Sequence, residues 1–111
     1  MALNSNGVLY SWGVGDEGQL GNETYNSSNE PLKILDDTLF IAASRSHSAA
    51  IKSDNSLYTW GSNIDYRLGL DERKNFNVPT NTKIKAVKVS LGTTHSAFIT
   101  IDGKVCLTGN G

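Results

Sequence analysis

The chain has 111 residues, enough for a single small domain that covers residues 1–111. Ten Lys and Arg residues against eleven Asp and Glu residues leave a net charge of −1, and the ten cations form no run. This balance predicts no binding to nucleic acids or to an acidic membrane surface. Cys106 is the only cysteine, which excludes an intrachain disulfide and a cysteine-based metal cluster.

The segment that follows Met1 is too polar for the apolar core of a signal peptide. No apolar run approaches the roughly 18 residues that would suggest a membrane span. We therefore expect a soluble intracellular protein, cytoplasmic or nuclear, with no membrane partner.

Short runs rich in aromatic and β-favouring residues, bounded by glycine and other turn residues, predict β-strands along the whole chain. No stretch has a sustained apolar period of 3.6 residues, so we expect almost no helix. Asp102-Gly103-Lys104 is a recognisable hairpin turn signal. The expected strands, about nine in number, cover residues 8–12, 31–34, 40–43, 47–51, 56–60, 78–80, 86–89, 95–99 and 104–109.

An internal repeat organises these strands. Sliding the chain by 48 residues superposes residues 1–63 on residues 49–111 with 16 identities in 63 pairs and no gap. Residues that recur at every repeat are usually there for the repeat itself. The recurring positions, to which we assign a structural role, are Trp12, Gly13, Leu20, Gly21, His47, Trp60, Gly61, Leu68, Gly69 and His95.

Four short strands in a unit of about 40–50 residues are the signature of a propeller blade. The expected fold is all-β: a partial β-propeller with blades of four antiparallel strands, an incomplete ring of about 2 to 2.5 blades. The repeat units are approximately 1–40, 41–88 and 89–111, the first and last being partial. We expect Trp12 and Trp60 to fill the wide space between blades.

Tyr10-Ser11-Trp12-Gly13, followed by Gly18-Gln19-Leu20-Gly21, closely resembles the hallmark of the regulator of chromosome condensation repeat. His47-Ser48 and His95-Ser96, each followed by Ala and a turn Asp, match the second half of that repeat. The resemblance covers essentially the whole chain and implies a seven-bladed propeller, of which this chain holds a little over two repeats. The third copy departs from the pattern, with Cys106 and Thr108 at the Tyr and Trp positions.

The segment 13–18, Gly-Val-Gly-Asp-Glu-Gly, spells the G-x-G-x-x-G pattern of a phosphate-binding loop and follows a strand. That function needs a helix to open at the glycines, whereas the next residues read as a turn. The pattern is also absent from the second copy, at residues 61–66. We interpret these glycines as parts of a tight blade turn and expect no cofactor.

His47 and His95 are candidates for a metal ligand or a general base. Neither has a Cys or carboxylate partner at a recognised metal-ligand spacing, so we favour an imidazole that bonds to a neighbouring backbone or blade. The adjacent acidic pairs, residues 36–37 and 71–72, are expected in solvated links. We therefore expect no metal, no catalytic residue and no enzyme activity.

The longest variable segments, residues 22–30 and 71–78, both join the third and fourth strands of a blade. Such loops share one face of a propeller, where a partner has access to them. These segments, and the turn that contains Arg67, include residue types that dominate interface energetics. The predicted partner-binding residues, for which ordinary loop decoration is the alternative, are Tyr25, Arg67, Arg73 and Phe76.

The first functional hypothesis is a non-catalytic protein–protein interaction scaffold, the commonest use of this repeat family. The alternative that the resemblance implies is a guanine-nucleotide exchange factor for a small GTPase such as Ran. The family's founding member exchanges nucleotide with a projecting β-wedge, and no such insertion is visible here. A third use, light sensing as in the plant UV-B photoreceptor, is set aside because its Gly-Trp-Arg-His-Thr motif is absent.

Two blades cannot close a ring, and each blade buries its faces only against its neighbours. The chain is therefore expected to be part of a longer propeller, or a protomer whose ring other copies or a large partner complete. We favour the first. An open arc of this chain alone would expose unpaired strand edges at residues 8–12 and 105–108, which invite pairing with another chain.

Overall fold

The computed structural model describes residues 1–63, 67–70 and 74–109, and in these residues it contains nine β-strands and no helix. The all-β fold expected from the sequence is confirmed. Within the same residues, no helix has the length and apolar character needed to cross a membrane. The strands are β1 (Ala2–Leu3), β2 (Leu9–Gly13), β3 (Ser28–Leu35), β4 (Thr38–Ala43), β5 (His47–Lys52), β6 (Ser56–Gly61), β7 (Phe76–Leu91), β8 (His95–Thr100) and β9 (Val105–Gly109).

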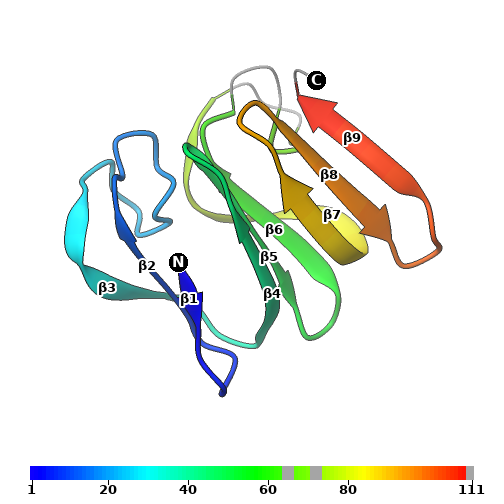
Figure 1. The fold of residues 1–111 in the computed structure, drawn as a ribbon, viewed down its shortest axis with the longest axis horizontal. Helices are drawn as coiled ribbons and strands as arrows, with labels where there is room; N and C mark the ends of the chain where they lie inside the picture. Colours follow the sequence, from blue (N-terminus) through cyan, green and yellow to red (C-terminus); the bar gives the residue numbers. More distant parts are fainter. Residues whose placement is uncertain (64–66, 71–73, 110–111) are drawn as a thin grey trace.

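The strands pair in chain order, all antiparallel, as a three-stranded sheet β1-β2-β3 and a six-stranded sheet β4 to β9. The long strand β7 serves two blades, because β6 pairs with its residues 76–85 and β8 with its residues 86–91. The chain thus builds a first blade (β1 to β3), a complete second blade (β4 to β6 with residues 76–85) and a third blade (residues 86–91, β8 and β9). Figure 1 shows the three blades side by side from left to right.

The chain passes between blades differently at the two junctions. Between β3 and β4 it turns at residues 36–37, where Asp37 has a φ of 52°. At the next junction only Lys83 has a positive φ, 67°, and the strand runs through as β7. The structure has nine strands, as expected, although two of the expected strands, at residues 78–80 and 86–89, form the single strand β7. The ninth is the short strand β1, which the sequence did not predict. The predicted free edge at residues 8–12 was wrong in part, because β1 pairs with Leu9 and Tyr10.

Two apolar clusters fill the spaces between the blades. Leu9, Ala50 and Trp60, all fully buried, form the centre of the cluster between the first and second blades. Because successive side chains of a strand point to opposite faces, Ala49 joins the other cluster, which lies between the second and third blades. The buried members of that second cluster are Ala49, Ile51, Leu57, Ala86 and Phe98.

The departures of the third copy compensate one another in volume. Ala50 and Trp60 of the second blade correspond to Phe98 and Thr108 of the third. The large aromatic has therefore moved from the third strand of the blade to the second, where Phe98 is 7% exposed and packs in the cluster between blades. Interiors tolerate exchanges that keep total volume, so the blade retains its packing without the repeat tryptophan.

The two tryptophans differ although their local sequences match. Trp60 is fully buried between blades, as expected, but Trp12 is 42% exposed. The expectation for Trp12 was wrong for this structure, because no described residue packs a further blade on that side of β2.

Candidate functional site

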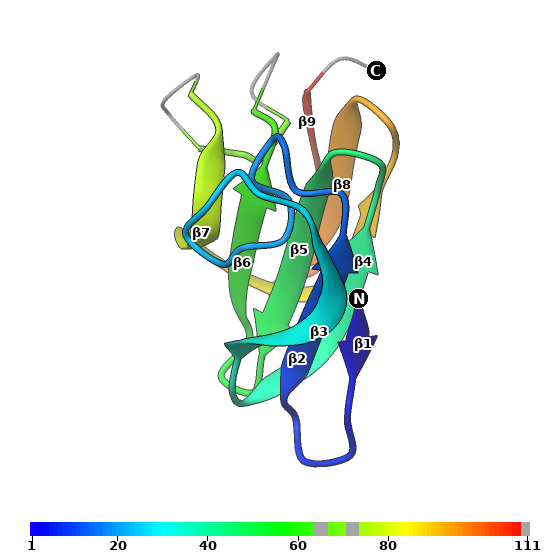
Figure 2. The same cartoon turned by 90° about the vertical axis from the view of Figure 1, so that its left-hand side faces the viewer.

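One backbone carbonyl accepts two of the hydrogen bonds that join the first and second blades. The carbonyl oxygen of Gln19 accepts hydrogen bonds from Trp60 Nε1 at 2.9 Å and from Ser48 Oγ at 2.8 Å. Ser48 lies on β5 and Trp60 on β6, so the loop between β2 and β3 lies over the second blade, as Figure 2 shows. Neighbouring blades are thus joined by buried polar contacts as well as by apolar packing.

The same junction recurs one repeat later. Ser96 Oγ donates to the carbonyl oxygen of Arg67, which occupies the position equivalent to Gln19. Within the blades, Ser11 Oγ and Thr59 Oγ1 donate to the carbonyl oxygens of Leu20 and Leu68, at 2.6 and 2.8 Å. The recurring leucines therefore lie at the points where each loop is tied to its own blade.

His47 is fully buried at the junction between the second and third blades. Its Nδ1 lies 2.6 Å from Ser44 Oγ and its Nε2 lies 3.1 Å from Ser96 Oγ. The single proton of Ser96 goes to the Arg67 carbonyl, so Nε2 donates to Ser96; because the lowered pKa of His47 keeps the imidazole neutral, Nδ1 accepts from Ser44. The structure therefore places a neutral imidazole in a chain of hydrogen bonds that crosses from one blade to the next.

The surroundings of His47 oppose a second proton. Burial of the imidazole, and then the positive charge of Arg67, lower the pKa of His47 from 6.5 to about 4. His95, the equivalent residue of the third blade, is only partly buried, and no described blade follows it. A general base needs a pKa near the working pH and access to a substrate, and His47 has neither.

Arg67 was predicted as a partner-binding residue, but the structure places it inside the same junction. Its side chain is only 6% exposed. One guanidinium nitrogen, Nη1, donates to Ser46 Oγ at 3.2 Å and to the carbonyl oxygen of Thr93 at 3.1 Å. Ser46 belongs to the second blade and Thr93 to the third, so Arg67 connects the blades and leaves little surface for a partner.

The acidic side chains do not assemble into a site. No group of three or more His, Cys, Asp or Glu side chains among the described residues is arranged to hold a metal ion. Asp36 and Asp37 are exposed in the turn between blades, and Asp36 pairs with Lys33 at 3.2 Å. The pair at residues 71–72 lies outside the described residues. The turn at residues 13–21 opens no helix, so the glycine-rich segment has no phosphate-binding architecture.

The two variable segments come together on the outside of the first and second blades. The backbone N–H of Glu23, in the loop between β2 and β3, donates to the carbonyl oxygen of Asn77 on β7 at 2.8 Å. Tyr25 is 49% exposed on that loop, and Val78 is 40% exposed on β7. A shallow hollow beside this contact is lined by residues 21–23, residues 32–35, Val78 and Pro79. We name these residues, with Tyr25, the loop surface.

The other predicted surface residues contribute less to the loop surface. Phe76 is partly buried, packs against the cluster around Trp60, and has the Lys74 ammonium 5.4 Å from its ring centre. Arg73 lies outside the described residues. Of the four predicted partner-binding residues, Tyr25 is the one whose side chain the structure places half-exposed on the loop surface.

Sequence reasoning missed the serines and the carbonyls that join the blades. Ser48 and Ser96 are identical in the 48-residue alignment, so the signal was present beside the histidines. The Gln19 and Arg67 carbonyls gave no signal, because a backbone acceptor is the same at every residue. The different side chains at this position concealed a shared backbone role.

This architecture, with one complete blade and parts of two more joined by repeated contacts, defines a β-propeller repeat protein. The family model of the regulator of chromosome condensation (RCC1) repeat matches residues 6–51 and 54–99, and a second model of that repeat matches residues 40–66. The chain belongs to the RCC1 repeat family, as the sequence motifs predicted. A comparison with curated protein sequences gave no significant match.

Solved structures agree with this assignment. Human WBSCR16 is 28% identical with a TM-score of 0.84, and Prp20p from Saccharomyces cerevisiae is 24% identical with a TM-score of 0.85. Yeast RCC1 (Prp20) bound to Kap60 is 22% identical with a TM-score of 0.83. These matches cover 97–98% of this chain, which spans about 30% of the length of those proteins.

Proposed function

We propose that this chain is a non-catalytic module that binds another protein through the loop surface. The observation that carries the proposal is the hydrogen bond from Glu23 to Asn77, which joins two segments that differ between repeats into one surface. Exposed aromatic side chains on loops held by a rigid scaffold are typical of protein-binding sites. Tyr25 is such a side chain, because Glu23, two residues before it, is hydrogen-bonded to Asn77 of the second blade.

The hollow of the loop surface suits a partner side chain. Leu32, Val78 and Pro79 supply apolar walls, and Asn22 and Glu23 supply polar groups at the side. Interfaces have the same organisation, an apolar centre with a polar rim. We infer that an apolar or aromatic side chain of the partner enters this hollow.

The outer strands favour recognition by side chains over strand addition. Pro31 on β3 and Pro79 on β7 occupy equivalent repeat positions, and proline has no N–H to offer an added strand. Among the described residues, β3 pairs only with β2, so its other edge needs this protection.

The solved neighbours support a protein as the class of partner. Prp20p was studied together with its binding to Gsp1p and histones, and yeast RCC1 (Prp20) was solved bound to Kap60. The second candidate function is the guanine-nucleotide exchange that the family resemblance implies. Accelerated release of labelled GDP from a panel of small GTPases would establish exchange, and unchanged release would favour the scaffold.

Site-specific photocrosslinking tests the loop surface directly. The chain is prepared with a photoreactive amino acid at position 25 and added to an extract of the cells that produce this protein. On irradiation we expect it to crosslink to a discrete protein. The same group at Ile101, which is 59% exposed in a turn of the third blade, is the matched control and should not capture it. Unlabelled chain should compete for the product and Val78→Asp chain should not. Equal capture from both positions, or equal competition, would contradict the proposal.

A further inference from the structure

A hollow lined mainly by polar side chains lies between the first and second blades, at the end of the second blade where β5 begins. Its volume is about 370 Å³, and we call it the junction hollow. One wall is the turn that follows β2, at residues 14–19. The other wall is the second blade, at residues 45–46 between β4 and β5 and at residues 62 and 67 after β6. Both walls therefore belong to blades that the chain itself contains.

The hydroxyl of Ser62 is buried at the junction hollow without a partner. Ser62 is fully buried, and its Oγ has no hydrogen-bond partner among the described residues. Its backbone N–H donates to the carbonyl oxygen of Ser46 at 2.8 Å, which holds the residue in place. A buried hydroxyl without a hydrogen bond costs free energy, and such groups are normally paired in native structures. Because Ser62 lines the hollow, a ligand bound there can pair with it.

Two arginines of the second blade line the same hollow. Arg67 is 6% exposed, and its Nη1 donates to Ser46 Oγ at 3.2 Å. Ser46 thus contacts both Arg67 and Ser62, which places the cation and the hydroxyl on one wall. Arg45 is exposed in the turn beside Ser46, and its carbonyl oxygen accepts from Gln19 Nε2 at 3.4 Å. Hydroxyl and guanidinium groups both donate to a carboxylate, so this wall suits a carboxylate.

The opposite wall carries negative charge. Asp16 and Glu17 belong to the turn after β2 and line the hollow. Among the described residues, no ion pair joins these two carboxylates to an arginine of the second blade. The opposite charges are therefore separated across the hollow. A ligand with only negative charge, such as a phosphate, would be repelled by this wall.

The polar side chains of the junction hollow are not required by the repeat. Residues that recur in every copy serve the repeat itself, whereas three residues of this hollow do not recur. At the equivalent positions the other copies have different functional groups: Val14 for Ser62, Thr93 for Arg45 and Ile64 for Asp16. We therefore assign these side chains a role other than the packing of blades.

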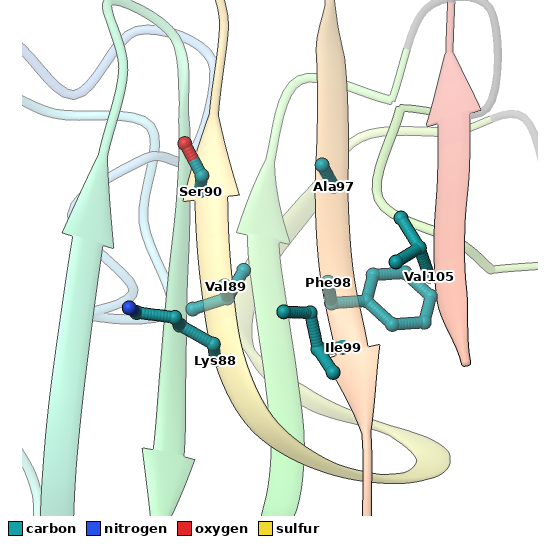
Figure 3. A pocket seen from close by; sticks show the side chains of 7 residues that line it. All are labelled: Lys88, Val89, Ser90, Ala97, Phe98, Ile99 and Val105. Atoms are coloured by element: carbon teal, nitrogen blue, oxygen red, sulfur yellow. The ribbon is translucent and has the colours of Figure 1, made fainter. Parts of the chain in front are cut away.

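The hollow on the third blade is of a different kind. Figure 3 shows it framed by β7, β8 and β9, with Ile99 and Val105 among the residues that line it. Their equivalents in the second blade, Ile51 and Leu57, are buried in the cluster between the second and third blades. The hollow on the third blade thus has the character of a junction between blades and not of a ligand site.

We propose that the junction hollow binds a small zwitterion, a free α-amino acid with an apolar side chain. Its carboxylate accepts hydrogen bonds from Ser62 and from the guanidinium groups of the same wall, and its ammonium group pairs with Asp16 or Glu17. Val14 also lines the hollow and offers an apolar contact to the side chain of the ligand. A zwitterion satisfies both walls, whereas a single charge satisfies one. This site is apart from the loop surface and does not depend on the proposed function.

Leucine and two analogues that each lack one charge test the proposal. Isocaproate is leucine without the ammonium group, and isoamylamine is leucine without the carboxylate. In NMR titrations of the whole chain, leucine is expected to shift the amide signals of residues around Ser62 and Asp16 until they saturate. Each analogue should bind at least about tenfold more weakly, because one charged wall is then left without its partner. Either analogue binding as tightly as leucine, or leucine causing no saturable shift, would overturn the proposal.

Ser62→Ala separates a ligand contact from a structural role. Removing a hydroxyl that has no partner should leave the urea midpoint no lower than that of the wild type, whereas the affinity for leucine should fall at least about tenfold. Ser53→Ala, in the exposed turn at the other end of β5, is the matched control and should bind leucine like the wild type. Unchanged affinity of the Ser62→Ala chain, or a lowered midpoint, would count against the assigned contact.

Neutralising the acidic wall tests the recognition of the ammonium group. A chain with both Asp16→Asn and Glu17→Gln should lose most of the preference for leucine over isocaproate, since its first-blade wall no longer needs a cation. Both side chains lie in a turn at the surface of the hollow, so far-UV circular dichroism should stay like that of the wild type. A double variant that keeps the full preference would refute the proposed pairing of the ammonium group.

Discussion

Replacing Trp60 by alanine tests whether the junction between blades, rather than each blade alone, holds this fold together. The indole of Trp60 is fully buried, packs with Leu9 and Ala50, and donates from Nε1 to the Gln19 carbonyl. Removing a buried aromatic of this size costs about 3–5 kcal/mol in the free energy of unfolding. The lost hydrogen bond adds little, because Ser48 Oγ still satisfies the Gln19 carbonyl.

Trp12 is the matched control for this substitution. It occupies the same repeat position, but its indole is 42% exposed and has no hydrogen-bond partner among the described residues. Trp12→Ala should therefore cost about 1 kcal/mol or less. Trp60→Phe keeps most of the packed ring and should cost about 1–2 kcal/mol, which keeps the test usable if the alanine variant fails to fold.

Urea denaturation followed by circular dichroism measures all three variants. With a slope of about 1–3 kcal/mol per molar urea, Trp60→Ala should lower the midpoint by roughly 1–5 M, and Trp12→Ala should lower it by about 1 M or less. Acrylamide should also quench the fluorescence of a Trp60→Phe chain more strongly than that of a Trp12→Phe chain. Equal midpoint shifts for the two alanine variants would refute the argument that burial between blades sets the cost.

Three further predictions concern the same junctions. The pKa of His47 is about 4 in the fold and about 6.5 in the unfolded chain, so between these values the unfolded chain binds more protons. The free energy of unfolding should therefore fall by up to about 3 kcal/mol as the pH drops from 6.5 to 4. Urea midpoints measured across this range should show the loss, and those of a His47→Gln chain should lack this contribution. Arg67→Gln, which installs the residue of the first repeat, should raise the pKa of His47, and an NMR titration of the imidazole that shows no rise would contradict the assigned charge effect. Gly61→Ala should cost well over about 1 kcal/mol, because the residue has a φ of 103° and a Cβ would lie 2.5 Å from the Ser46 carbonyl oxygen. At Gly13, where φ is 104°, an added Cβ would have no other atom within 4 Å. Gly13→Ala should therefore lower the free energy of unfolding only by the backbone strain of about 1 kcal/mol, and thermal unfolding should distinguish it from Gly61→Ala.

The fold class followed from the sequence because its signals are periodic and local. Leu9-Tyr10-Ser11-Trp12-Gly13 and its copy 48 residues later show strand preference, a terminal glycine and a fixed spacing without any knowledge of contacts. The loop surface was found only in part. Tyr25 was predicted and is exposed, whereas the hydrogen bond between Glu23 and Asn77 joins residues more than 50 positions apart and had no sequence signal.

The sequence by itself determined the repeat, the four-stranded blade and the family, since each depends on residue types at fixed spacing. Only the tertiary structure decided which copy of a repeated residue is buried: Trp60 and Trp12 each lie between a strand residue and a glycine, yet among the described residues a preceding blade packs only against Trp60. It also moved Arg67 from the predicted surface into the junction and paired His47 with Ser96. The physical reason is that burial and hydrogen bonding between blades depend on the neighbour that packs there, whereas strand preference and turn chemistry belong to the residues themselves.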